Sequence, residues 1–345
     1  MKNAPPEKHP PKKAIKSLQF DLFTQFITNE PSEVSNTVEI WESIPKYFFT
    51  AKQVEKLRTK TGHADPYKWE YHRDGVLYAV KIQPALIEQG DGNYKAFFPS
   101  VTEELVEEAL KKIFSDQQYG IHDAYNDESW VRFTLKMIQK ELKARGRSRD
   151  INQIKQAIEV MSSTILTFYN NGKEVWKGSI LQDLVTIGRE EYLADTDAHH
   201  VARLPLFISL SINRLEYRQF NYDRFMGCNE QLSRWIYKRL INRFKQASLM
   251  NQYHFLYSDL KASGLLQQTR ERDNRSKVLS SLNELVERGV LLNYEVENRK
   301  EGKIVIDVKY TVFPSVEFVS EQKAANMRSS QNKTLASQTN LISVD

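Results

Sequence analysis

The sequence predicts an α+β protein in which helices followed by a two-stranded hairpin occur twice in tandem. The clearer set has three helices and two strands, over about 229–247, 257–263, 270–288, 291–296 and 303–312. Its third helix is expected because Val278, Leu282, Leu285 and Val286 repeat at helical spacing, and because Gly289 follows where helices commonly end. Helices followed by a hairpin in this order are typical of a winged-helix domain, so the sequence predicts two such domains.

The composition is that of a globular chain. It has 345 residues, enough for two domains of ordinary size, with 40% hydrophobic and 27% charged residues. No apolar run approaches the roughly 18 residues of a spanning helix, and no secretory leader is expected, so membrane partners are not predicted. The single cysteine, Cys228, can form neither an internal disulfide nor a cysteine-based zinc site, which fits a cytoplasmic location.

Positive charge is concentrated at two places along the chain. The net charge of the whole sequence is +5. Residues 230–310 contain 15 Lys and Arg against 10 Asp and Glu, and residues 1–16 contain five lysines against one glutamate. Such clustering is typical of nucleic-acid contact, and a merely soluble surface is the alternative on charge alone.

Four segments are expected. Residues 1–37 are predicted to form a flexible basic arm, and residues 38–225 the first winged-helix domain with an added N-terminal hairpin. Residues 226–319 are predicted to form the second winged-helix domain. Residues 320–345, rich in Ser, Gln and Asn, are predicted to be a disordered tail.

The first domain is predicted from its turns and helices. Asp74-Gly75 and Asn171-Gly172 are strong hairpin turns, and a third turn is expected over 90–93. Helices are expected from Thr102, over 130–144 and over about 150–165. A strand over 180–187 and a β-rich piece over 204–220 should follow.

The third helix of the second domain has the features of a helix that enters a DNA major groove, with a polar face and cations at its start. The expected DNA-binding residues of this helix and of the following hairpin, the wing, are Arg270, Arg272, Arg275, Ser276, Lys277, Ser280, Asn283, Arg288, Arg299, Lys300 and Lys303. Cations at the helix start would meet phosphates or guanine, Ser280 and Asn283 would read bases, and the wing cations would meet the backbone. A winged helix that binds another protein is the alternative.

Two other helices carry charge whose role is less specific. In the helix over 229–247, Leu232, Ile236 and Leu240 should face the core, while the remaining surface should carry Arg234, Lys238, Arg239, Arg243 and Lys245. In the first domain, the corresponding face mixes Lys155 and Gln156 with Glu159. Dimerisation or weak backbone contact is at least as well supported there as base reading.

A short apolar segment lies within the N-terminal arm, at Gln19, Phe20, Asp21, Leu22 and Phe23. It closely resembles the Gln-Leu-Ser/Asp-Leu-Phe peptide by which bacterial proteins bind the replicative sliding clamp, with Phe20 in place of the usual Leu. The resemblance implies that Leu22 and Phe23 fill an apolar pocket of the clamp and that Gln19 bonds at its rim. The alternative is a segment that docks on the protein's own body.

No enzyme motif was found. None of the 13 glycines lies in a phosphate-binding Gly-x-x-x-x-Gly-Lys-Ser/Thr loop. A metal-dependent nicking nuclease needs two histidines separated by one residue, whereas His199 and His200 are adjacent and are expected in a loop or on the surface. Asp91, Asp195 and Asp197 lack the ligand set of a calcium loop. No catalytic residue, metal or cofactor is therefore predicted.

The order of these parts resembles the plasmid replication initiators of the TrfA/RepA type, over roughly residues 17–315. The stretch from Phe98 to Glu107, which precedes the helices and hairpin of the first domain, adds a local similarity to the same family. The resemblance implies binding to directly repeated origin sequences (iterons), opening of an AT-rich region, recruitment of host DnaA, replicative helicase and clamp, and control of plasmid copy number. It also implies a dimer in equilibrium with a DNA-binding monomer, with residues 130–220 as the dimer face and residues 226–318 reading the repeat.

The leading hypothesis is therefore a non-enzymatic protein that binds double-stranded origin DNA. A winged-helix transcriptional repressor is the alternative; it would need no clamp peptide and would prefer an inverted repeat. The two roles are compatible, since an initiator can repress its own promoter. A rolling-circle nuclease would nick supercoiled DNA in the presence of metal, and we expect no nicking.

Overall fold

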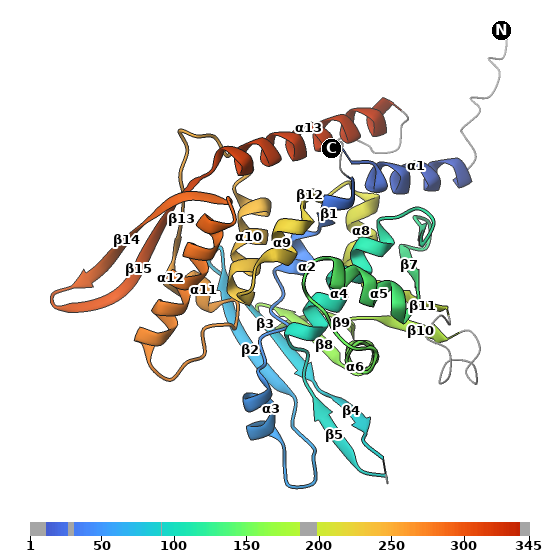
Figure 1. Ribbon diagram of the computed structural model, residues 1–345, viewed down its shortest axis with the longest axis horizontal. Coiled ribbons are helices and arrows are strands. Elements are labelled where there is room, and N and C mark those ends of the chain that lie inside the picture. The colour runs from blue at the N-terminus through green and yellow to red at the C-terminus, as the bar shows by residue number, and fades with distance from the viewer. Residues whose placement is uncertain (1–11, 27–30, 91, 187–198, 339–345) are drawn as a thin grey trace.

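The computed structural model describes residues 12–26, 31–90, 92–186 and 199–338. Helices and strands are mixed along the chain, as the α+β prediction requires. The buried apolar side chains of both halves form one continuous core. A hairpin at one end and a lobe at the bottom project from the body, and two helices run along its top (Figure 1).

The first winged-helix domain consists of three helices followed by a hairpin. The helices are α4 (Val101–Phe114), α5 (Leu135–Ala144) and α6 (Ile151–Ser163), and the strands are β8 (Ile165–Asn170) and β9 (Lys173–Ser179). Asp150 caps α6 by accepting a bond from the Gln153 amide at 2.8 Å. Asn171 and Gly172 have φ values of 46° and 77°, as the predicted tight turn requires.

Extra strands enlarge this domain. β2 (Tyr67–Arg73) and β3 (Val76–Gln83) turn at Asp74-Gly75 as predicted and extend the sheet to the order β2-β3-β8-β9. The hairpin of β4 (Ala85–Glu88) and β5 (Tyr94–Phe97) contains the expected third turn, of which Asp91 is outside the described residues. Ala85 and Ile87 pack on Val160 of α6, so this hairpin covers the end of that helix. The short helix α3 (Ala51–Leu57) comes before β2.

A second sheet replaces part of a predicted helix. Its order is β10-β11-β7-β6, from β6 (Gly120–Asp123), β7 (Glu128–Phe133), β10 (Gln182–Thr186) and β11 (His200–Arg203). The helix predicted from Trp130 was therefore placed too early, because residues 128–133 pair with β6 and β11. Helix α5 begins after Thr134, whose hydroxyl accepts a bond from the Met137 amide at 3.1 Å. Asp195 and Asp197 are outside the described residues.

Two further predictions in this region were wrong. His200 is not on the surface, since it is a buried residue of β11 whose ring stacks on Phe133 with centroids 5.3 Å apart. His199, beside it, is exposed as expected. The predicted β-rich piece contains the helix α8 (Leu206–Asn213) before β12 (Arg218–Asn221). A short apolar run does not by itself distinguish a buried helix from a strand. Here packing against α1 (Lys12–Thr24), α2 (Glu39–Glu42) and β7 favours the helix.

The second winged-helix domain has the three helices and the hairpin in the predicted order, together with one strand, β13 (Tyr253–Leu256), that was not predicted. It contains α10 (Gln231–Arg243), β13, α11 (Tyr257–Lys261), α12 (Glu271–Glu287), β14 (Leu291–Glu301) and β15 (Ile304–Pro314). The strands form a sheet in the order β13-β15-β14. Helix α9 (Tyr222–Gly227) connects the two domains, and α10 packs on both α12 and the first-domain helix α2 (Glu39–Glu42).

Helices occupy most of the described parts of the predicted arm and tail, where disorder was expected. α1 (Lys12–Thr24) occupies part of the predicted arm, followed by η1 (Pro31–Glu33) and β1 (Val34–Thr37), which pairs with β12. α13 (Val316–Gln338) occupies most of the predicted tail. Figure 1 shows α1 and α13 on the same side of the body. Residues 1–11, 27–30 and 339–345 are outside the described residues, so the predicted disorder of those parts stays a prediction.

The segment from Gln19 to Phe23 lies in α1 and is docked on the protein's own body. Phe20 packs near Phe114 with ring centroids 5.2 Å apart, and Leu22 and Phe23 are only 2% and 4% exposed. Gln19 Nε2 donates to the Asn213 carbonyl at 2.8 Å. The expectation of an accessible peptide in a flexible arm is therefore corrected. The segment is held by an apolar surface that residues distant in the sequence form, and local composition does not reveal such a surface.

The C-terminal helix fixes this docked helix from above. Arg328, 3% exposed, donates to the carbonyls of Leu22 and Phe23 at 3.0 and 2.7 Å, and Asn332 donates to the Leu22 carbonyl at 3.3 Å. These carbonyls belong to the last turn of α1 and have no partner within their own helix. Polar side chains that suggested disorder in the sequence therefore act as a cap between the two ends of the chain.

His122 supports the surface on which α1 docks. Its Nδ1 lies 2.9 Å from the Ser129 hydroxyl, its Nε2 lies 2.9 Å from Asn213 Oδ1, and its ring stacks on Phe20 at 6.1 Å. Burial lowers the pKa of His122 below its usual value of 6.5.

Stability should consequently fall as the pH is lowered from 7 to 5. The unfolded chain, in which His122 has its ordinary pKa, takes up a proton that the folded state resists, so the free energy of unfolding decreases through that range. We expect His122→Gln to show a smaller decrease than the unsubstituted protein in urea unfolding at the two pH values. The exposed His63→Gln is the control, and equal decreases in all three proteins would contradict the assignment.

Candidate nucleic-acid interface

The start of α12 is fixed by buried polar contacts. Asn274, 2% exposed, accepts a bond from the Gln268 amide at 2.9 Å and donates to the Gln268 carbonyl at 3.0 Å. Glu271 accepts bonds from the Tyr257 hydroxyl and from Lys261, which join the first turn of α12 to α11. Behind them Val278, Leu282 and Leu285 are fully buried, as the sequence predicted. The loop and helix therefore present their outer face in a defined orientation.

The exposed face of α12 is polar and carries most of the residues predicted to bind DNA. Arg270, Arg272, Ser276, Ser280, Asn283 and Arg288 are all exposed. Arg270 and Arg272 lie at the helix start, while Ser280 and Asn283 follow one and two turns beyond Ser276. A helix that carries cations at its entry and short polar side chains along one face can meet phosphates with the former and base edges with the latter.

Two of the predicted cations are partly buried. The Lys277 ammonium donates to the Leu265 carbonyl at 3.0 Å, and burial lowers its pKa. The Arg275 guanidinium lies 5.7 Å from the centre of the Tyr257 ring. Lys277 therefore ties α12 to the preceding loop, and Arg275 is positioned against α11, whereas Arg270 and Arg272 extend into solvent.

Asn283 links α12 to the wing. Its Oδ1 accepts a bond from the Tyr294 hydroxyl on β14 at 2.7 Å. No bond from its Nδ2 is found within the described parts of the chain. The amide is thus held in one orientation, and its Nδ2 is left as a hydrogen-bond donor.

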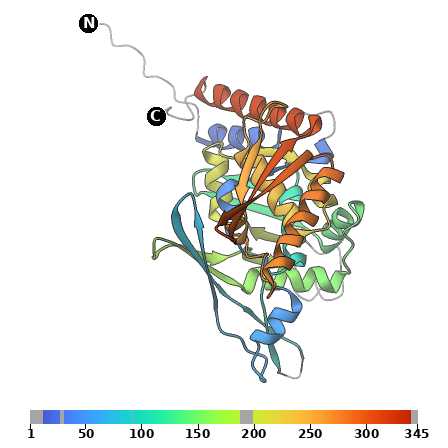
Figure 2. The same cartoon turned by 90° about the vertical axis from the view of Figure 1, so that its left-hand side faces the viewer.

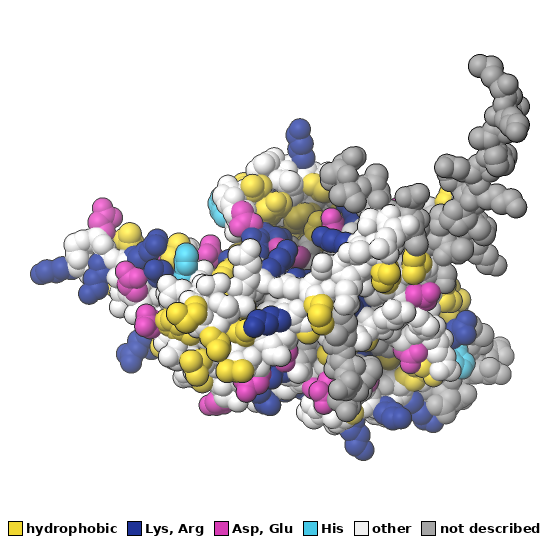
Figure 3. All heavy atoms as spheres, turned by 90° about the horizontal axis from the view of Figure 1, so that it is seen from above, with side chains coloured by type: hydrophobic (Ala, Val, Ile, Leu, Met, Phe, Trp, Pro, Cys, Tyr) yellow, Lys and Arg dark blue, Asp and Glu magenta, His cyan; other side chains and the backbone are white. Residues whose placement is uncertain are grey.

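The wing is a long hairpin that projects from the body (Figure 1). β14 and β15 pair from Leu291–Pro314 to Glu301–Ile304, and Gly302 at the turn has φ +59°. Arg299, Lys300 and Lys303 are exposed near the tip, with a register irregularity between Arg299 and Lys300. Seen from above, Lys and Arg side chains lie among Asp and Glu side chains on this projecting end (Figure 3). The wing therefore brings its predicted cations together at a position beyond α12.

A chain of polar contacts connects α12 with the first domain. Glu284 on the inner face of α12 accepts bonds from the amides of Asn229 and Glu230, at 2.5 and 3.0 Å. These amides start α10, where a carboxylate is favourable. Arg147, from the loop between α5 and α6, donates to the Met226 carbonyl at 2.6 Å and to Asn229 Oδ1 at 3.0 Å. Helix α12 and the first domain thus both contact Asn229.

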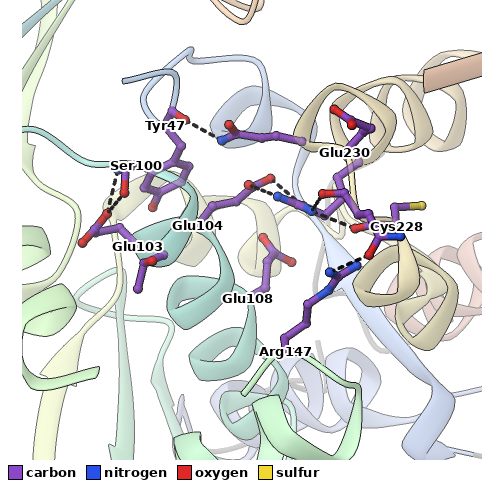
Figure 4. A network of polar contacts seen from close by, with 12 residues as sticks. Tyr47, Ser100, Glu103, Glu104, Glu108, Arg147, Cys228 and Glu230 are labelled. Carbon is purple, nitrogen blue, oxygen red and sulfur yellow. Dashed lines mark hydrogen bonds and ion pairs between the residues drawn. The ribbon is translucent and has the colours of Figure 1, made fainter. Parts of the chain in front are cut away.

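Arg234 extends this connection to α4. It is 1% exposed and donates to both Glu104 oxygens at 2.8 and 3.3 Å, and to the Cys228 carbonyl at 2.8 Å (Figure 4). Lys238, one turn further along α10, is also buried and bonds to Glu108 at 2.6 Å and pairs with Glu42 at 2.9 Å. Both residues were expected on the exposed surface of this helix. That expectation was wrong because their partners lie more than a hundred residues away, where no local pattern indicates them.

More charged groups complete a buried cluster beside this contact. Lys111 pairs with Glu42 at 2.6 Å and with Glu108, and Glu107 accepts bonds from Trp41 at 2.5 Å and Tyr47 at 2.7 Å. Burial alone would raise the pKa of Glu42, but the charges of Lys111, Lys238 and Lys46 lower it well below its usual range. The surrounding lysines therefore favour the charged form of the Glu42 carboxylate, although water is excluded there.

The described residues contain neither a candidate metal-binding group nor a helix that could span a membrane. Within residues 12–26, 31–90, 92–186 and 199–338, no group of three His, Cys, Asp or Glu side chains could hold a metal ion. Across the same ranges, no helix is both long and apolar enough to cross a bilayer.

Comparison with known proteins gives likeness among solved structures only. No protein-family model matches the chain, and no curated protein sequence matches it. A crystal structure of domains 2 and 3 of RctB matches with a TM-score of 0.46 and 13% identity, over 75% of this chain and 95% of that one. Another structure of RctB domains 2–3 matches at 0.40 and 14%, over 78% and 97%. The Pi initiator protein in complex with iteron DNA matches at 0.42 and 10%, over 62% and 91%.

The Arg234–Glu104 contact can be tested through stability. Glu104→Gln removes the charge that compensates a buried guanidinium, so the free energy of unfolding should fall by about 3 kcal/mol in urea titration. The matched control is Glu55→Gln, which removes the exposed carboxylate partner of Arg58 and should cost about 1 kcal/mol or less. Equal losses in the two variants would mean that the contact between α4 and α10 does not depend on this ion pair.

Proposed function

We propose that the chain is a plasmid replication initiator that binds directly repeated origin sequences (iterons) through its second winged-helix domain. The observation that carries the proposal is the combination of two elements: a polar face on α12 with arginines at the helix start, and a projecting wing with three exposed cations near its tip. Arg270 and Arg272 would meet phosphates at the start of α12, and Arg299, Lys300 and Lys303 would meet the backbone from the wing. Ser280 and Asn283 would enter the major groove and read base edges.

The work of such a protein is done by binding energy, and we propose no enzymatic activity. Occupation of adjacent repeats would bend and strain the duplex, and an AT-rich segment nearby would open because it is the least costly to deform. Host DnaA and the replicative helicase would then be recruited to the opened origin, and the number of occupied repeats would set plasmid copy number. This role places the protein in the bacterial cytoplasm, on plasmid DNA or the nucleoid.

The first winged-helix domain would serve mainly as a contact with a second copy of the chain. The hairpin of β4 and β5 packs on the end of α6, which leaves less of that helix free to enter a groove than is free on α12. A dimer formed through residues 130–220 would be in equilibrium with a DNA-binding monomer.

Base reading by Asn283 can be separated from backbone contact. Asn283→Ala should weaken binding to the repeat by about 1–3 kcal/mol and leave binding to a random duplex unchanged. Lys300→Ala should weaken both equally, because a phosphate contact carries no sequence information. Affinities would be measured by fluorescence anisotropy at fixed salt.

Tyr294→Phe is the control for this experiment, since it removes the bond to Asn283 but keeps the amide. If Tyr294→Phe reproduced the loss in Asn283→Ala, the asparagine would position the wing rather than read a base. A footprint confined to an inverted repeat, with no protection of direct repeats, would support the transcriptional repressor instead.

We also propose that the segment from Gln19 to Phe23 binds the sliding clamp, in a state in which α1 has left the body. Leu22 and Phe23 are the side chains that a clamp pocket would take, and both are buried in the docked helix. Undocking would break the bonds from Arg328 and Asn332 to the carbonyls of α1. This contact with α13 would therefore limit how much of the peptide is available.

Arg328→Ala should accordingly increase clamp capture in a pull-down several-fold, because it removes two bonds that hold the end of α1. Lys323→Ala, an exposed change on the same helix, should leave capture unchanged. Adding Leu22→Ala and Phe23→Ala to the Arg328→Ala protein should abolish capture. Capture that persists in the triple variant would remove this segment from clamp binding.

A further inference from the structure

We infer that helix α3 and the turn after it form an additional DNA-backbone-binding surface beside the recognition helix. The surface consists of Lys52, Lys56 and Lys60, here named the lysine strip. This inference rests on the proposed function, because it extends the interface that α12 and the wing would make with DNA. It concerns a part of the first domain to which the sequence pattern gave no role.

The local structure of α3 displays these lysines together. The helix begins with a reciprocal cap, in which Thr50 donates its amide to Gln53 Oε1 at 2.8 Å and accepts the Gln53 amide at 3.3 Å. Val54 is buried and holds the inner side of the helix. Lys52 and Lys56 are four residues apart and therefore share a helix face. They and Lys60 are exposed.

The charge of the lysine strip is not neutralised by its neighbours. Glu55 pairs with Arg58 at 2.8 Å, and Arg58 also donates to the Ala96 carbonyl at 2.7 Å and lies on the Phe97 ring. These two opposite charges thus compensate each other. Among the ion pairs found in the described ranges of the chain, none involves a residue of the lysine strip. Three cations are therefore presented to solvent with no acidic partner on α3.

The position of α3 places this charge next to the start of α12. Gln53 Nε2 donates to Gln267 Oε1 at 2.6 Å, and Gln267 lies three residues before Arg270. Phe48, just before α3, packs so tightly on Gly264 that a Cβ there would lie 2.7 Å from its ring. Trp69 Nε1 adds a bond to the Ala262 carbonyl at 3.4 Å. The segment that leads into α12 is thus held directly against the element that carries the lysine strip.

The two ribbon views agree with these contacts. In both, α3 lies below the lower end of α12, where the chain enters the helix (Figures 1 and 2). In Figure 2 the wing and α12 lie side by side, and α3 lies below them. A duplex whose backbone passes Arg270 and Arg272 would continue toward the lysine strip. Phosphates recur every few ångströms along that path, so cations so placed would each neutralise one.

The chemistry of the surface suits sequence-independent contact. Lysine ammonium groups act as point charges on flexible stems and bind phosphate without fixing a base. No Asn, Arg or Ser is presented beside them on the outer face of α3, in contrast to α12. The lysine strip should therefore add affinity and salt dependence to binding without adding discrimination between sequences.

The test is the salt dependence of DNA affinity for the full chain carrying Lys52→Gln and Lys56→Gln. The slope of log K against log salt should become less steep by about 1.8, since each phosphate contact contributes roughly 0.9. The same fold-loss of affinity should appear on a repeat-containing duplex and on a random duplex. Adding Lys60→Gln should lower the slope further. Unchanged thermal unfolding would show that the fold is retained.

The matched control is Lys323→Gln with Lys333→Gln, which removes two exposed lysines from α13 at the opposite side of the molecule. It should keep the original slope. If the Lys52→Gln/Lys56→Gln protein had the same salt slope as this control, the lysine strip would not be a DNA contact. A loss of affinity for the repeat-containing duplex alone, with none for the random duplex, would also contradict the inference. If the unsubstituted protein showed no preference for a repeat-containing duplex, the proposed function would be refuted separately. The salt slope measured on random DNA would still test the contact made by the lysine strip.

Discussion

The structure depends on a buried, balanced set of charges where the two winged-helix domains meet. Four carboxylates, Glu42, Glu104, Glu107 and Glu108, face four cations, Lys46, Lys111, Arg234 and Lys238. Removing such groups from water costs several kcal/mol each, which only close, well-directed pairing offsets. The ion pairs join α2 to α4 through Glu42 and Lys111, α2 to α10 through Glu42 and Lys238, and α4 to α10 through Glu104 and Arg234. The relative orientation of the domains is therefore set by charge geometry as well as by the shared core.

This constraint extends to the proposed DNA interface. Arg234 holds Glu104 of the first domain and the carbonyls that precede α10, while Glu284 of α12 holds the amides that start α10. Helix α12 is thus connected through its inner face to the chain segment that the first domain also contacts, while its outer face is exposed. On the other side, the contact of Gln53 with Gln267 positions the lysine strip beside the same helix. Elements from both domains would consequently approach DNA as one rigid surface.

Local patterns were sufficient for much of the fold and for the exposed part of the site. The apolar repeat at Val278, Leu282 and Leu285, and the glycine turns at Asp74-Gly75 and Asn171-Gly172, each predict an element from neighbours in the sequence. The same repeat leaves Ser280 and Asn283 outward, so the polar face of α12 was predictable. Patterns failed where the partner is distant. The apolar run from Leu206 does not specify helix or strand, and Trp130 pairs with strands that no local signal indicates.

By itself, the sequence determined the α+β class, the two helix-and-hairpin units, and the cations of the recognition helix and wing, because periodicity and turn chemistry act over a few residues. The tertiary structure alone decided which cations are available to a partner: Arg234 and Lys238 are buried in ion pairs, whereas Lys52 and Lys56 are exposed beside α12. It also decided that α1 is docked and that α13 is ordered, through bonds from Arg328 to Leu22 and Phe23. Those outcomes depend on residues more than a hundred positions apart, whose proximity is created only by folding.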